Sequence, residues 1–407
     1  MKTLLEALGA VALTALLPVA AGRMSPGMEE RLADGVEIIG IVHWGLNTYT
    51  DREWGFGDEK PELLAPSDFD ADQIVGACRD GGLQGLVVVA KHHDGFCLWP
   101  TKTTAHNISA SPFRGGKGDY VGEMCAACRK AGVRFGVYCS PWDRHDADYA
   151  TEKYVTTYHE QVRELNDGRY GEIFEMWFDG ANGGDGWYGG ANGGKGEKRK
   201  ILGREYYRFD ELFARLRALQ PKLTIFGMGG DFMWPGNECG YVDPTLDPSD
   251  ERHFRMWEAD FPLRRGWFYH ERDRGTTRSA AYLMKLYLSS VGNGGTMNIG
   301  IAPDRRGRLC EEDARALKGF AEIRRAFFST EVSTPFKEYN VVVEKRDHRK
   351  YIKVLEEPMR MLGKDGPFAD RALKRYYVEP ELLRLIRAST SESGETDTAR
   401  WMTRPTH

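Results

Sequence analysis

Short apolar runs alternate with longer amphipathic segments from about residue 36 onward. Apolar runs of strand length lie at 36–43, 83–90, 133–140, 172–179, 223–227, 266–270 and 296–302. Segments with helical spacing lie at 69–82, 119–132, 148–166, 204–220, 279–292 and 311–328. Strands that are apolar on both faces and alternate with helices are typical of a parallel sheet covered by helices.

Such a sheet can stay open as a doubly wound fold or close into a barrel. A nucleotide-binding open sheet carries a glycine-rich phosphate loop in its first strand–helix turn. Here that turn is long and aromatic, with the sequence HWGLNTYTDREWGFG at 43–57. The repeating units also span a length that suits a barrel. We therefore predict an α/β fold, a (β/α)8 TIM-like barrel over residues 30–330.

The two ends of the chain have a different character. Lys2, an apolar run and small residues at 20–22 predict a signal peptide at 1–22, and hence a periplasmic or secreted protein. Glu6 interrupts this pattern, so an amphipathic N-terminal helix stays open as an alternative. Residues 331–407 form a short C-terminal extension of unknown role, too short for a β-sandwich of about 100 residues.

Charge and composition exclude several classes of partner. The chain has 56 basic and 60 acidic residues, so it offers no polycationic field for nucleic acid. No later run of about 20 apolar residues predicts a membrane span. Seven cysteines show no disulfide spacing, and the pair Cys125 and Cys128 is expected to be free, buried thiols. Nothing in these features indicates an oligomeric state.

Polar residues gather at the ends of four predicted strands, where barrel enzymes place their catalytic groups. The first ends at His43, the second runs into His92 and His93, the third holds Tyr138, and the fourth ends at Asp179. Four consecutive strands would therefore deliver imidazoles, a phenol and a carboxylate to one rim.

Strand parity gives the fourth case more detail. Side chains alternate across a strand, so Glu175, Trp177 and Asp179 share one side, opposite an all-apolar set. The apolar set should face the helices, which leaves Asp179 facing the barrel axis as the natural nucleophile. Glu175, lower in the strand, is expected to be a buried, hydrogen-bonded structural acid.

The adjacent histidines raise the question of a metal. Neighbouring strand residues point to opposite faces, so His92 and His93 are awkward ligands for one ion unless the strand has already ended before them. No further ligand spacing supports them. Binding of substrate hydroxyls is the better interpretation, and we predict neither a metal nor another cofactor.

Several long motifs carry a family resemblance from about residue 30 to 328. They are HWGLNTYTDREWGFGDE, AKHHDGFCLWPTKTT, GVYCSPWDRHDADY, WFDGANGGDGWYGG, PGNECGY, RRGWFYH and SSVGNGGTMNIGIAPDRRG. Together they resemble family 29 α-L-fucosidases, most closely the branch that acts on α-1,3/1,4-linked fucose. The resemblance implies a (β/α)8-like barrel, a retaining mechanism without a metal, and a fucosylated oligosaccharide or glycoprotein glycan as substrate.

The resemblance also implies roles for individual residues. Asp179 in WFDG resembles the family nucleophile, and Glu238 in PGNECGY resembles the acid/base of that branch. Glu258 and Glu271 lie nearby in sequence and are alternatives to Glu238, although each is more typical of a surface or salt-bridge glutamate. The residues that resemble the fucose pocket are His43, Glu53, Trp54, His92, His93, Tyr138 and Trp267.

These residues suit retaining hydrolysis, which needs two carboxyl groups about 5–5.5 Å apart. One attacks the anomeric carbon and the other protonates the leaving oxygen. Three other interpretations stay open. A galactosidase-like barrel would use the same chemistry with a polar partner where fucose has its methyl group. The second interpretation is a catalytically silent carbohydrate-binding barrel, and the third is a metal-dependent hydrolase.

Overall fold

The computed structural model describes residues 24–181, 201–250 and 252–329. The predicted signal peptide at 1–22, the glycine-rich stretch at 182–200 and the C-terminal extension at 331–407 lie outside these residues. Eight parallel strands close into one barrel in chain order. The last strand pairs with the first, with Ile38 opposite Met297, which completes the closure. The predicted barrel is therefore confirmed, and the open doubly wound sheet is excluded.

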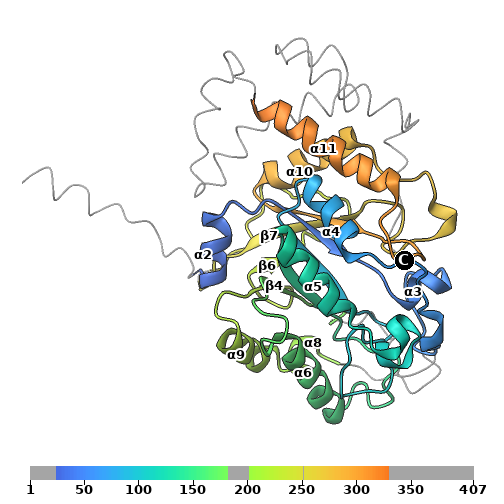
Figure 1. Ribbon diagram of the computed structural model, residues 1–407. Coiled ribbons are helices and arrows are strands. Elements are labelled where there is room, and N and C mark those ends of the chain that lie inside the picture. Colours follow the sequence, from blue (N-terminus) through green and yellow to red (C-terminus); the bar gives the residue numbers. More distant parts are fainter. Residues whose placement is uncertain (1–23, 182–200, 251, 330–407) are drawn as a thin grey trace, which may run out of the picture.

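The strands are short and helices surround them (Figure 1). The strands are β1 Ile38–Val42, β2 Gly85–Lys91, β3 Arg134–Cys139, β4 Glu175–Trp177, β5 Thr224–Phe226, β6 Phe232–Met233, β7 Met256–Pro262 and β8 Thr296–Ile301. The α-helices are α2 Pro26–Ala33, α3 Leu46–Thr50, α4 Ala71–Asp80, α5 Tyr120–Ala131, α6 Glu152–Asn166, α8 Gly203–Tyr206, α9 Phe209–Leu219, α10 Ala280–Ser290 and α11 Glu311–Ser329. Single 3-10 turns lie at Pro61–Leu63, Ile108–Ala110, Phe113–Gly116, Glu271–Asp273 and Val291–Asn293.

The helix boundaries follow capping chemistry that the sequence carries. The Asp70 carboxylate caps α4 by accepting a hydrogen bond from the backbone N–H of Gln73 at 2.9 Å, and Asp119 caps α5 in the same way. Gly132 ends α5 at φ 69°, in the left-handed region that favours glycine. The helix predicted at 204–220 is wrong as a single helix, because the structure has two helices there. Arg208, at φ 52°, interrupts it and divides it into α8 and α9.

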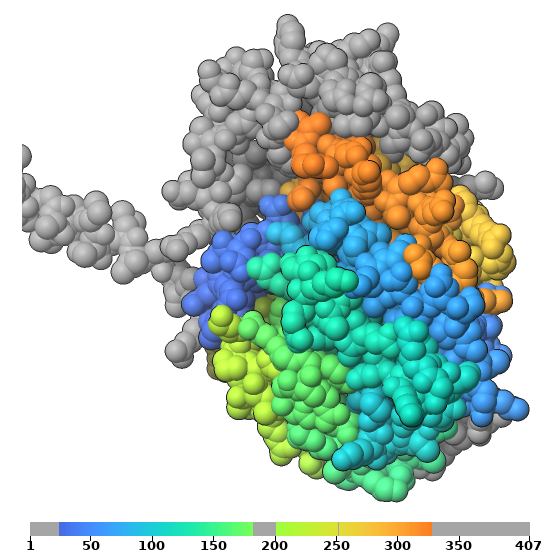
Figure 2. Space-filling model, in the orientation of Figure 1, coloured from blue at the N-terminus to red at the C-terminus, as the bar shows by residue number. Residues whose placement is uncertain are grey.

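Two hydrophobic cores lie on the two sides of the barrel wall. The outer core fills the space between strands and helices. On one face α11, α4 and α5 lie side by side outside the strands (Figure 1), and their residues form much of the surface there (Figure 2). The inner core fills the barrel itself with the alternate side chains of the same strands. Its buried members in the strands are Ile39, Ile41, Val87, Val89, Tyr138, Trp177, Phe226, Phe232 and Met256.

The N-terminal end of the barrel is closed by α2, whose Arg31 reaches inside. The Arg31 guanidinium pairs with Glu175 and donates to Glu258 Oε2 at 3.1 Å, and all three side chains are buried. Burial raises the pKa of Glu175 well above its usual value, although the Arg31 charge opposes this. We call Arg31, Glu175 and Glu258 the floor cluster. Glu175 is thus the buried structural acid that strand parity predicted.

One predicted strand is wrong and two were missed. Residues 266–270 form an irregular loop after β7, not a strand. The true strands of this region, β6 and β7, escaped prediction because β6 has only two residues and β7 carries Glu258 and Asp260 within an apolar run. Both carboxyls face the barrel interior, where they break the apolar pattern that marks the other strands.

Candidate active site

The strand ends bring the predicted rim residues together. The ring centroids of His43 and His92 lie 5.8 Å apart, those of His92 and His93 lie 4.1 Å apart, and His92 stacks on Tyr138 at 5.8 Å. His43, His92 and His93 directly follow β1 and β2, and Tyr138 lies near the end of β3. The aromatic rings therefore form a continuous wall at the C-terminal mouth of the barrel.

Asp179 lies beside this wall, two residues beyond the end of β4. Tyr138 Oη donates to its Oδ2 at 3.0 Å, and His93 Nε2 lies 3.6 Å from the same oxygen. Burial and the nearby Asp179 charge raise the pKa of Tyr138 well above its usual value, so the phenol keeps its proton and remains a donor. The Asp179 side chain is 47% exposed. Tyr138 and His93 thus contact one carboxylate oxygen, Oδ2, while the side chain remains accessible to solvent.

The three rim histidines are neutral near neutral pH. Burial lowers the pKa of His43 and of His93 to about 4, and it lowers the pKa of His92 well below its usual value. A neutral imidazole can donate through one nitrogen and accept through the other, which suits sugar hydroxyls.

Glu53 connects two loops at the rim. Its carboxylate accepts the Trp267 backbone N–H at 2.9 Å and also contacts His270 Nε2. The structure thus gives Glu53 a role in holding the 266–270 loop in addition to any contact with substrate. Its neighbour Trp54 is half exposed and stands edge-on to His93, with ring centroids 5.8 Å apart.

Glu238 lies on the loop after β6 and faces the same mouth. The Trp267 indole donates to Glu238 Oε2 at 3.2 Å, and the Trp267 ring lies 5.1 Å from that of His43. Desolvation by its neighbours at the mouth raises the pKa of Glu238, although the residue is exposed at the surface, and the charges of Asp179 and Glu53 raise it further against the Trp267 hydrogen bond. A carboxyl with a raised pKa is suited to donate a proton.

The two alternative glutamates have other partners. Glu258 belongs to the floor cluster and accepts the Trp177 indole at 2.7 Å. Glu271 accepts the Tyr269 hydroxyl at 2.8 Å and pairs with Arg274 at 2.6 Å. Both glutamates are thus engaged in salt bridges, which favours Glu238 as the acid.

Two rim residues, Asp260 and Trp234, were not predicted from the sequence. Asp260, on β7, is buried and accepts the Trp234 indole at 3.0 Å. Burial raises the pKa of Asp260 well above its usual value, and the charges of Glu238 and Asp179 add to this. The sequence signal that could have revealed Asp260 is the spacing of Glu258 and Asp260, two positions apart within the otherwise mainly apolar segment MWEADFP. We call Asp179, Glu238 and Asp260 the rim carboxyls.

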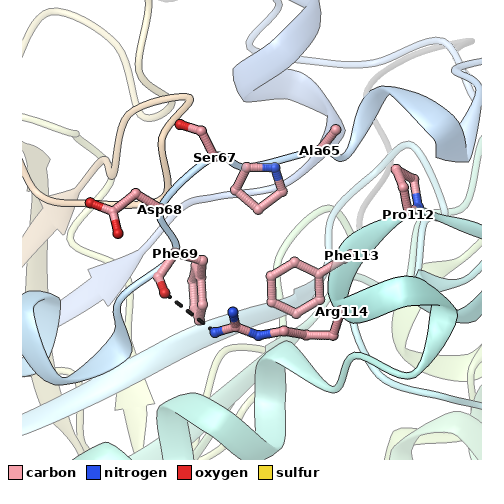
Figure 3. A pocket seen from close by; sticks show the side chains of 8 residues that line it. Ala65, Ser67, Asp68, Phe69, Pro112, Phe113 and Arg114 are labelled. Atoms are coloured by element: carbon pink, nitrogen blue, oxygen red, sulfur yellow. Dashed lines mark hydrogen bonds between the residues drawn. The ribbon is translucent and has the colours of Figure 1, made fainter.

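A separate surface pocket of about 260 Å³ lies away from the rim residues (Figure 3). Phe69 and Phe113 stand edge-on within it, with ring centroids 5.2 Å apart. Arg114 donates to the Phe69 carbonyl at 3.3 Å and pairs with Glu123. The other charged residue that lines the pocket, Asp68, pairs with Arg308 at 3.2 Å, so both charges of the pocket are engaged in salt bridges.

Within the described ranges, no three or more His, Cys, Asp or Glu side chains are grouped so that they could hold a metal ion. None of the helices in those ranges combines the length and apolar character needed to cross a bilayer. Cys125 and Cys128 are buried and free, as expected.

The sequence of the chain matches those of known proteins. The family model described as Alpha-L-fucosidase matches residues 28–323. Alpha-L-fucosidase 1 of Arabidopsis thaliana is 34% identical over 72% of this chain and 59% of its own length. A relative from Oryza sativa subsp. japonica is 36% identical over 72% of this chain and 57% of its own length. The matches thus cover less than two thirds of these curated relatives.

Solved structures agree with the sequence comparison. A glycoside hydrolase 29 family member from an unknown rumen bacterium has a TM-score of 0.71 and 35% identity, over 78% of this chain and 60% of that one. A Ruminococcus gnavus GH29 fucosidase in complex with fucose has a TM-score of 0.64 and covers 78% of this chain and 70% of its own. At 24% identity it supports the fold alone. With a matching family model over most of the barrel, the chain belongs to the alpha-L-fucosidase family, glycoside hydrolase family 29.

Proposed function

We propose that this protein is a retaining exo-α-L-fucosidase that releases terminal α-1,3/1,4-linked L-fucose from oligosaccharides or glycoprotein glycans. The observation that carries the proposal is the accessible Asp179 carboxylate, held by Tyr138 beside a protonatable Glu238. Family membership supports the fucoside, and the resemblance of PGNECGY to one branch of the family supports the linkage.

The reaction follows from these two carboxyl groups. Asp179 attacks the anomeric carbon of fucose while Glu238 gives its proton to the leaving oxygen, which forms a covalent fucosyl-enzyme. Glu238, now ionised, takes a proton from a water molecule, and that water attacks the anomeric carbon and releases Asp179. Two inversions at one carbon retain its configuration.

The surrounding groups bind and orient the sugar. The neutral imidazoles of His43, His92 and His93 can each exchange hydrogen bonds with ring hydroxyls. Tyr138 keeps the nucleophile oriented through its hydrogen bond to Oδ2. Trp267, packed near His43, offers an apolar surface to the sugar.

The test is release of fucose from an aryl α-L-fucoside, 2′-fucosyllactose and Lewis-type trisaccharides, with EDTA present. We expect release from the aryl fucoside and the Lewis-type sugars, little from 2′-fucosyllactose, and no effect of EDTA. Proton NMR of the first product should show the α anomer of fucose. Folded protein that releases fucose from none of these substrates would refute the proposal, and the β anomer would refute the retaining mechanism.

A further inference from the structure

An exposed indole at the rim is fixed by a buried carboxyl. Trp234 directly follows β6, and 46% of its surface is exposed to solvent. Its Nε1 donates at 3.0 Å to Oδ1 of Asp260, which is only 4% exposed. A buried carboxyl thus holds the exposed indole in one position, and a ring held in this way can serve as a fixed stacking surface for a ligand.

The orientation of this indole suits a sugar. Tryptophan commonly binds through its apolar face while its N–H finds a polar partner. Here the N–H is already satisfied by Asp260, so the ring has its apolar surface left to offer. One face of a pyranose ring is made of C–H groups, and stacking on an indole removes both apolar surfaces from water.

The position of Trp234 relative to Glu238 indicates which sugar. Glu238 lies four residues later on the same loop, and its charge contributes to the raised pKa of the Asp260 carboxyl, so the two carboxyl groups lie close together. In the proposed reaction Glu238 protonates the oxygen that joins fucose to the rest of the glycan. A surface beside Glu238 is thus beside the leaving sugar, whereas the imidazole wall lies beside the fucose.

We propose that Trp234, held by Asp260, forms the binding site for the pyranose that carries the fucose. This inference rests on the proposed function and extends it to the leaving-group side. Trp234 then acts on specificity: it favours glycan substrates over simple fucosides without taking part in bond cleavage. Asp260 is a positioning residue that acts through the indole.

The test compares two substrates that differ only in the leaving group. α-L-Fucosyl fluoride carries no leaving sugar, and a Lewis-type trisaccharide carries one. Trp234→Ala should lower kcat/KM for the trisaccharide about tenfold, the size of one aromatic contact, mainly through KM. The same variant should change kcat/KM for the fluoride by less than about twofold. Leu219→Ala, an exposed apolar residue at the end of α9, is the matched control and should change neither.

Two variants of Asp260 separate the hydrogen bond from the charge. Asp260→Asn keeps an oxygen that can accept from Trp234, so the ratio of the two kcat/KM values should stay close to that of the wild type. Asp260→Ala removes the acceptor and should reproduce the loss seen with Trp234→Ala. Thermal unfolding of each variant confirms that it is folded.

The outcomes are distinct. Equal losses on the fluoride and the trisaccharide in Trp234→Ala would overturn the leaving-sugar site while leaving the fucosidase proposal intact. Loss of fluoride turnover in Asp260→Ala would overturn the positioning role and assign Asp260 to the fucose pocket. A folded wild-type protein inactive on both substrates would refute the fucosidase proposal, and this site with it.

Discussion

The barrel holds two groups of carboxyls at its opposite ends, and their partners differ. In the floor cluster, Glu175 and Glu258 are buried around the single Arg31 guanidinium. At the rim, the contacts described for the carboxyls come from neutral or weakly basic groups: the Tyr138 phenol, the Trp234 and Trp267 indoles and the His93 imidazole. The floor therefore has a permanent cation, while the rim carboxyls have hydrogen-bond donors and one another.

This difference separates stability from chemistry. A buried carboxyl paired with arginine is costly to disrupt, and in the floor cluster burial also keeps both carboxyls away from any substrate. Carboxyls that lie close together without a cation acquire different affinities for the proton, which is what an acid and a nucleophile require. Mutations at the floor should thus affect folding, and mutations of Asp179 or Glu238 should affect rate.

The largest effect is expected at the nucleophile. Asp179→Asn keeps the size of the side chain and removes its nucleophilic charge, so kcat should fall roughly 10⁴- to 10⁶-fold. The free energy of unfolding should stay within about 0.5 kcal/mol of the wild-type value, because the side chain is half exposed. Steady-state kinetics and urea unfolding measure the two quantities. A variant with near-normal turnover would remove Asp179 from the mechanism.

The next effect concerns the acid. Glu238→Gln cannot donate a proton, so kcat/KM for a natural glycan should fall about 10²- to 10⁴-fold. α-L-Fucosyl fluoride, whose leaving group needs little protonation, should lose far less in that step. Azide should partly restore turnover of the fluoride by replacing water in the second step. Equal losses on both substrates without rescue by azide would point to another acid.

At the floor, Arg31→Met should destabilise the fold instead. Removing the cation leaves two buried carboxyls without their partner, at a cost of about 3–5 kcal/mol in the free energy of unfolding. Arg79→Met, which breaks an exposed pair with Asp80, is the control and should cost less than about 1 kcal/mol. Urea unfolding compares the two variants. Equal and small losses would show that the floor cluster is not a stabilising feature.

The smallest effect is a shift in the pH profile. Since Glu238 must be protonated to act as an acid, kcat/KM for a glycan should fall as pH rises through its raised pKa. The Trp267 hydrogen bond lowers that pKa, so Trp267→Phe should raise it and move the alkaline limb to higher pH by less than about one unit. Initial rates from pH 4 to 9 test the sign. A limb that moves to lower pH would contradict the assignment of this limb to Glu238.

Much of the fold was predictable because its signals are local. Apolar strands such as β1 and β2 stand out against amphipathic helices, and Asp and Gly caps mark the helix ends. The region of β6 and β7 was not predictable in this way. There Glu258 and Asp260 lie inside the barrel, paired with Arg31 and Trp234 from distant parts of the chain. A buried carboxyl resembles a surface one until its partner is known.

The site likewise has residues that could be predicted from local sequence and contacts that could not. Residues at strand ends, such as His43, Tyr138 and Asp179, could be placed from strand parity and barrel geometry alone. Contacts between loops could not, so neither the Trp267 contact with Glu238 nor the Trp234 contact with Asp260 was foreseen. The link between Glu53 and the backbone of Trp267 spans 214 positions and has no local signature.

The floor cluster also has a consequence for the order of folding. Arg31 is synthesised early, but its partners follow 144 and 227 residues later along the chain. During synthesis its charge has to stay in water until β4 and then β7 have emerged. Contacts of such sequence separation raise the contact order and slow the folding of a domain. Closure of the barrel floor is thus expected to be a late step, at which the N-terminal helix docks onto strands made long after it.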